Sequence, residues 1–172
     1  TKKLLSHYNI RKPVFRYVPS KDFSNFKNIA LVTDAGTPAI SDPGRMLVKE
    51  LSAKGFTVIP VPGPSSLSAL VSASDLNLAE FLFLGFPPAK KGRQKFFKRV
   101  AESEIPTVLF ESPHRILKTL QELYNEAGER RVNIGRELTK IHEEIFRGKI
   151  SEALAYFKGA KERGEFVIAV DA

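Results

Sequence analysis

The chain has 172 residues, a formal net charge of +8 and 42% hydrophobic residues, which is the balance of a soluble globular protein with one or two domains. It has no Cys, so disulfides, thiol catalysis, iron–sulfur clusters and Cys-based zinc sites are excluded. No apolar run approaches the roughly 20 residues of a membrane span, and no signal peptide is visible, so we expect a cytoplasmic protein.

In the first half, short apolar runs alternate with helical patterns. Residues 1–8 are typical of a helix end, and residues 13–18 of a short strand. Apolar runs bounded by turn residues predict buried strands over 28–33, 56–61 and 81–86. The spacing of Met46, Leu47 and Leu51 predicts a helix that ends near Gly55, and a second helix follows the turn at 62–64.

The segment over residues 87–92 is short and polar and begins with two prolines, which is typical of a linker. Beyond them, helices are predicted around Phe97, from Pro113 and from Ile150, and strands over 107–110, 132–137, 144–149 and 166–170. Strands that alternate with helices predict an α/β fold with several parallel neighbours. We expect two α/β domains, an N-terminal one over residues 1–86 and a C-terminal one over residues 87–172.

The positive charge is spread over both halves but is densest just after this linker. Six cations without an acid fall within ten residues, namely Lys90, Lys91, Arg93, Lys95, Lys98 and Arg99. Clustered cations favour contact with the phosphates of a nucleic acid. The alternative is a solvated helix face whose Phe96 and Phe97 point into the core.

The loop over residues 33–44 carries the strongest functional signal. It follows a predicted buried strand and precedes a helix, and ligands of open α/β sheets bind at the carboxyl ends of strands. Gly36 permits a ligand to approach the backbone closely, while Thr37 and Ser41 offer hydroxyl groups. A polar loop of this length in a compact sheet is more often functional than a simple capped turn.

A second loop, residues 62–66, also joins a predicted strand to a helix, so the two loops could face one pocket. Neither loop matches the dinucleotide or the P-loop fingerprint. Two further segments, 110–115 and 135–144, mix cations, carboxylates and a His. Their Arg115, Arg136 and Lys140 suit either phosphate contacts or ordinary ion pairs with neighbouring glutamates.

Six strings in this order, TDAGTPAISDPG, VPGPSS, FLFLGFPP, FESPHR, GRELTKIHEE and GEFVIAVDA, resemble the ribosomal RNA small subunit methyltransferase I family. This family belongs to the tetrapyrrole methylase class of S-adenosylmethionine (SAM) methyltransferases. The resemblance implies two α/β domains with a ligand cleft between them that holds SAM, in a homodimer. The implied reaction is methylation of a cytidine ribose 2′-hydroxyl in small-subunit (16S) rRNA, without a metal.

The resemblance also implies which residues carry the function. The SAM-binding residues would be Asp34, Ala35, Gly36, Thr37, Ile40, Ser65, Ser66 and Phe110. Together with the basic run, Arg115, Arg136 and Lys140 would bind RNA. Methyl transfer to a hydroxyl also needs a proton acceptor. Glu111 and Glu137 are the carboxylates that we expect in that role, ahead of His114.

The sequence departs from the family in two places. The family begins with a strand and a Gly-containing loop that would precede Thr1, and residues 17–27 lack its His-Asn-Glu motif. We therefore expect a fragment, or the ordered part of a longer chain, with apolar surface uncovered beside the strand at 28–33. Two other functions stay open, namely a methyltransferase of small tetrapyrroles and a non-catalytic RNA-binding protein.

Overall fold

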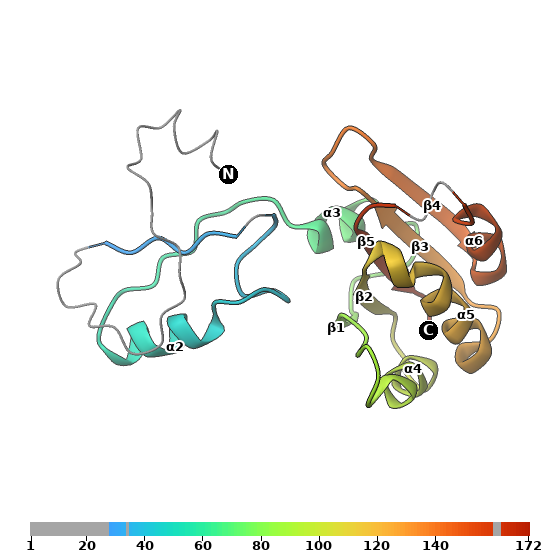
Figure 1. Cartoon of the computed structure of the whole chain (residues 1–172), viewed down its shortest axis with the longest axis horizontal. Coiled ribbons are helices and arrows are strands. Elements are labelled where there is room, and N and C mark those ends of the chain that lie inside the picture. The colour runs from blue at the N-terminus through green and yellow to red at the C-terminus, as the bar shows by residue number, and fades with distance from the viewer. Residues whose placement is uncertain (1–27, 34, 160–162) are drawn as a thin grey trace.

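The computed structural model describes residues 28–33, 35–159 and 163–172 (Figure 1). Its centre is a five-stranded sheet in the order β1-β2-β5-β3-β4. The strands are β1 (Leu82–Gly85), β2 (Thr107–Glu111), β3 (Arg131–Arg136), β4 (Glu144–Lys149) and β5 (Phe166–Val170).

Only one pair of strands in this sheet is parallel. β1 runs parallel to β2, whereas β2–β5, β3–β5 and β3–β4 are antiparallel. The expected run of several parallel neighbours is therefore wrong for this sheet. The physical reason at β3–β4 is the short connection over residues 137–143, which suits a hairpin, because a parallel pair needs a crossover of a dozen or more residues.

Helices cover both faces of the sheet. The described helices are α2 (Arg45–Ala53), which lies apart from the sheet, and α3 (Ser66–Ser72), α4 (Arg93–Ala101), α5 (Ile116–Ala127) and α6 (Ile150–Tyr156), which pack on it, with a 3₁₀ turn η1 (Pro113–Arg115) before α5. One core unites α4, α5 and α6 with the side of β5 that carries Ile168. Val167 and Ala169 alternate with it and pack with α3 on the opposite face. The sheet is thus the middle of three layers.

The predicted elements between residue 81 and the end of the chain are confirmed, and so are the helices α2 and α3. The predicted strands over 28–33 and 56–61 are wrong, because both segments are coil. Neither pairs with another strand among the described residues, and a strand needs a hydrogen-bonded neighbour. Ile59 and Val61 are 75% and 86% exposed.

The sheet takes in elements from both sides of the expected linker. β1 and α3 precede residue 87, yet β1 pairs with β2, and α3 packs on β5 and β3. Figure 1 shows α2 apart from the sheet, joined to it by the chain that leads into α3. The division of the chain at residue 87 stays a prediction. The helix expected over 1–8 and the strand over 13–18 lie outside the described residues.

The described helices are also too short or too polar to pass through a lipid bilayer.

Candidate functional site

A cavity of about 830 Å³ lies where the loops of the first half meet the sheet. This volume falls within the ~300–1,000 Å³ of small-molecule sites. The first half contributes residues 29–33, 35–37, 40–44 and 64–66. Phe86, after β1, also lines it, and the second half contributes residues 110–113 at the end of β2 and in the turn after it, residues 138–140 after β3, and residues 165–167 at the start of β5.

The two polar loops of the first half meet at this cavity, as the sequence predicts. The Thr37 hydroxyl donates a hydrogen bond of 3.0 Å to the carbonyl oxygen of Pro64. Ser41 also packs closely on β1, since a Cβ added to Gly85 would lie 3.0 Å from its Oγ. The loop is therefore fixed both to the start of α3 and to the sheet.

All but one of the residues expected to bind SAM line this cavity. The lining includes Ala35, Gly36, Thr37, Ile40, Ser65, Ser66 and Phe110. Asp34 lies outside the described residues. Ser65 also caps α3, because its Oγ accepts a 3.4 Å hydrogen bond from the Ser68 amide.

The composition of the walls suits an amphipathic ligand. Phe86 and Phe110 pack edge to face with ring centroids 5.5 Å apart, which gives an apolar aromatic surface. Three hydroxyl-bearing residues, Thr37, Ser65 and Ser66, line the cavity from the loops of the first half. Such walls fit SAM, which combines an aromatic base with a ribose, a sulfonium and an amino-acid group.

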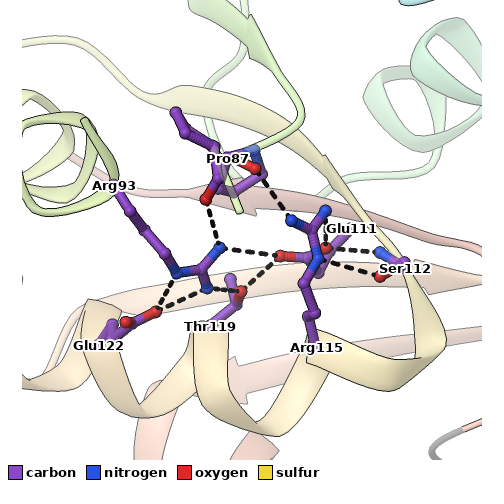
Figure 2. A network of polar contacts seen from close by, with 8 residues as sticks. Pro87, Arg93, Glu111, Ser112, Arg115, Thr119 and Glu122 are labelled. Carbon is purple, nitrogen blue, oxygen red and sulfur yellow. Dashed lines mark hydrogen bonds and ion pairs between the residues drawn. The ribbon is translucent and has the colours of Figure 1, made fainter. Parts of the chain in front are cut away.

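Glu111 is fully buried and both of its carboxylate oxygens are engaged (Figure 2). Oε1 accepts a hydrogen bond from the Ser112 amide at 2.7 Å and forms an ion pair with the Arg115 guanidinium at 2.8 Å. Oε2 accepts from the Thr119 hydroxyl at 2.5 Å, and Arg93 lies 3.9 Å from it. The side chain expected to accept the substrate proton is thus held inside the protein.

Glu137 lies on the β3–β4 loop and binds its neighbours there. Its Oε1 accepts from the Lys140 ammonium at 2.9 Å and from the Glu165 amide at 2.8 Å. The hydrogen bond from Lys140, followed by that from the Glu165 amide, lowers the pKa of Glu137. Hydrogen bonds to Glu165 and Glu137 raise the pKa of Lys140, which lines the cavity.

The expected RNA-binding residues separate into an exposed group and a paired group. The exposed group, which we call the α4 strip, is Lys90, Lys91, Lys95, Lys98 and Arg99. Arg93 is only 5% exposed and faces inward, so it does not belong to the exposed group. Arg115 pairs with Glu111, and Arg136 pairs with Glu144 at 2.9 Å. Phe97 is buried and Phe96 is half-buried, as expected if the two rings of the basic run point into the core.

Sequence reasoning missed the wall of the cavity made by the second half of the sheet. Leu138, Thr139 and the start of β5 at Phe166 belong to it. They lie in two of the strings that carry the family resemblance, but no spacing rule places them beside residues 35–41. Their proximity depends on β3 and β5 being neighbours in the sheet.

The comparisons with known sequences agree with one another. Residues 10–154 match the family of Tetrapyrrole (Corrin/Porphyrin) Methylases. The chain is 39% identical over 180 residues to the Ribosomal RNA small subunit methyltransferase I of Thermotoga maritima, covering 99% of this chain and 81% of that protein. It is 39% identical to the protein of that name from Synechocystis, covering 99% of this chain and 65% of that one. The chain thus spans less than two thirds of the second relative.

Solved structures show the same fold. The methyltransferase CobJ superposes with a TM-score of 0.58 at 17% identity, over 80% of this chain and 62% of its own. A uroporphyrin-III C-methyl transferase from Thermus thermophilus, complexed with S-adenyl homocysteine, gives 0.52 at 20% identity, over 78% and 62%. With this fold, the family match over most of the chain and the Thermotoga relative, the chain belongs to the tetrapyrrole methylases and, among them, to the ribosomal RNA small subunit methyltransferase I family.

Proposed function

We propose that this chain transfers a methyl group from SAM to the 2′-hydroxyl of a cytidine ribose in small-subunit rRNA. Family membership makes it a SAM-dependent methyltransferase. The observation that carries the proposal is the cavity itself, which gathers the described residues expected to bind SAM from segments about 75 residues apart in the chain.

We assign the adenine-binding surface to Phe86 and Phe110, and the polar contacts to Thr37, Ser65 and Ser66. Gly36 leaves open space where a side chain would stand. The Lys140 ammonium at the cavity wall could meet a carboxylate or a phosphate. Bound SAM supplies a methyl group that is electrophilic because it is attached to a sulfonium.

The reaction is an in-line displacement. The ribose oxygen forms a bond to the methyl carbon, the bond from that carbon to sulfur breaks, and its electron pair stays on the sulfur. The hydroxyl proton passes to solvent water in the same process. The protein's main contribution is to hold the reacting atoms in line, and such positioning lowers a barrier by up to about 7–11 kcal/mol in favourable cases.

We propose positioning roles for Glu111 and Glu137, in place of the expected role as the base. Glu111 is buried with both oxygens bound to donors. The pKa of Glu137 is lowered, so its carboxylate binds a proton even less readily at neutral pH. Lys140 has a raised pKa and is a cation there, which suits contact with RNA or SAM rather than proton uptake.

The α4 strip supports RNA as the substrate. Its five exposed cations, Lys90, Lys91, Lys95, Lys98 and Arg99, lie over one helix and the turn before it. Of these, Lys98 lies 3.6 Å from Glu102 in an exposed pair that contributes little. A small tetrapyrrole would not require such a strip beyond the cavity. An rRNA substrate implies a cytoplasmic location, and the homodimer stays a prediction.

The test is methyl transfer from tritiated SAM to small ribosomal subunits that lack the modification, with uroporphyrinogen as the competing acceptor. We expect label in the rRNA, recovered after nuclease digestion as a 2′-O-methylcytidine. Label in uroporphyrinogen alone would favour the tetrapyrrole alternative. RNA binding without SAM binding, measured by calorimetry, would favour the non-catalytic alternative.

A further inference from the structure

We infer that Arg93 and Arg115 are positioning residues that hold two walls of the SAM cavity together. One wall is Phe86, which begins the segment 86–88 after β1, and the other is residues 110–113, at the end of β2 and in the turn after it. Glu111 lies between the two arginines, and Figure 2 shows the resulting network. The inference rests on the proposed function, since it assigns SAM to this cavity.

Arg115 uses all parts of its guanidinium to bridge these walls. Nη2 lies 2.8 Å from Glu111 Oε1, and Nε donates to the Ser112 hydroxyl at 3.1 Å. Nη1 donates to the carbonyl oxygen of Pro87 at 3.2 Å. One side chain thus binds the end of β2, the turn that follows it and the segment after β1.

Arg93 repeats this bridge from the other side. Its Nη1 donates to the carbonyl oxygen of Pro88 at 3.1 Å, and its Nη2 donates to the Thr119 hydroxyl at 2.7 Å. Nη2 also lies 2.6 Å from Glu122 Oε2 on α5. The Thr119 hydroxyl in turn donates to Glu111, so the network closes on that carboxylate.

The network is balanced in charge and buried at its centre, while Arg115 and Glu122 are half-buried. Arg93 and Glu111 are 5% and 1% exposed, and the two arginines face the two carboxylates of Glu111 and Glu122. Removing one partner of a buried ion pair leaves the other without compensation, which is strongly unfavourable. The guanidinium donors are also used within the protein, so these two cations are not available to RNA phosphates in this arrangement.

The consequence for the cavity is a fixed aromatic pair. Phe86 directly precedes Pro87, and Phe110 directly precedes Glu111. Both rings line the cavity, and their centroids are 5.5 Å apart. Because the arginines bind the backbone after Phe86 and the carboxylate after Phe110, they set the distance between these rings before any ligand arrives.

The experiment compares Arg115→Ala and Arg115→Lys with a matched control, Arg130→Ala. Arg130 also binds backbone oxygens, those of Val100, Ala101 and Asp171, but it does not line the cavity. We expect Arg115→Ala to weaken SAM binding in calorimetry at least tenfold, and Arg115→Lys to weaken it less, because an ammonium keeps the ion pair but not the fork. Arg130→Ala should lower the melting temperature to a similar extent and leave SAM affinity within twofold.

A second readout does not depend on SAM. Hydrogen exchange of the Ser112 amide, which donates to Glu111, should accelerate in Arg115→Ala and not in Arg130→Ala. Unchanged exchange and unchanged SAM affinity in Arg115→Ala would overturn the positioning role. If the unmodified chain bound no SAM, the proposed function would fail instead, and the exchange measurement would still decide whether Arg115 orders the turn.

Discussion

At the scale of single residues, backbone strain is concentrated beside the cavity. Among the described residues, the non-glycine positions with positive φ are Ala39, Ser41, Glu137 and Thr139. All four lie in the two loops, 35–44 and 137–143, that contribute to the walls of the cavity. Each such residue costs on the order of 1–3 kcal/mol, and strain of this kind gathers at functional sites. This distribution agrees with the site proposed for SAM.

Gly36 provides the sharpest test of the SAM site. Its φ is +73°, and nothing lies within 4 Å of the position of an added Cβ. Gly36→Val should therefore abolish SAM binding in calorimetry, while the fold survives with a strain cost of about 1–3 kcal/mol. Gly55→Val is the matched control, because Gly55 has a φ of +83° and equally open surroundings but does not line the cavity. Equal SAM affinity in the two variants would refute the placement.

Glu137 should make stability depend on pH in the acid range. Its folded pKa lies below the ordinary 4.5, chiefly because Lys140 donates to its carboxylate. The stabilisation is therefore present above the unfolded pKa and is lost as pH falls through the folded pKa. In urea unfolding, Glu137→Gln should be less stable than the unmodified chain at pH 7, and the difference should shrink below about pH 4. Glu126→Gln, an exposed change on α5, is the control; a gap that stays constant with pH would contradict the assignment.

At the scale of elements, α4 combines a structural face with a charged one. Phe97 and Val100 are buried in the core, and the Arg93 guanidinium lies 5.0 Å from the Phe97 ring centroid. Lys95, Lys98 and Arg99 are exposed on the remaining surface. The burial of Phe97 and Val100 agrees with the core-facing interpretation of the run, because a helix presents its residues on different faces. Phosphate contact by the exposed cations stays a prediction.

The exposed face of α4 should contribute phosphate contacts. Reversing Lys95, Lys98 and Arg99 to Glu should weaken rRNA binding and leave SAM affinity unchanged. Each lost contact should lower the slope of log affinity against log salt by about 0.7–0.9. Reversing three scattered exposed lysines, Lys49, Lys118 and Lys158, makes the same change in net charge. If both triple variants lowered the slope equally, total charge rather than α4 would explain the binding.

At the scale of the whole molecule, the cavity depends on both parts of the chain. The sheet has a buried core on each face, whereas the segment before α3 exposes Val58, Ile59 and Val61. The Thr37–Pro64 hydrogen bond joins the two loops of the first half, and Ser41 packs against Gly85 of β1 at the edge of that sheet. A ligand between them would contact segments that otherwise touch little.

The positions of the helices and of the last five strands could be predicted from the sequence, because they depend on local periodicity, caps and turn residues. The two polar loops of the first half could also be predicted, because Gly36 and the hydroxyl-bearing residues Thr37 and Ser41 are typical of a polar turn between elements. Three features could not be predicted from the sequence. They are the antiparallel direction of most strand pairs, the burial of the Arg93 side chain, and the contacts of Thr119 and Arg115 with the Glu111 carboxylate. These features depend on which groups meet across long stretches of chain. A cation run has the same sequence whether its members face water or a buried carboxylate, and only the packing of α4 against α5 and β2 decides between them.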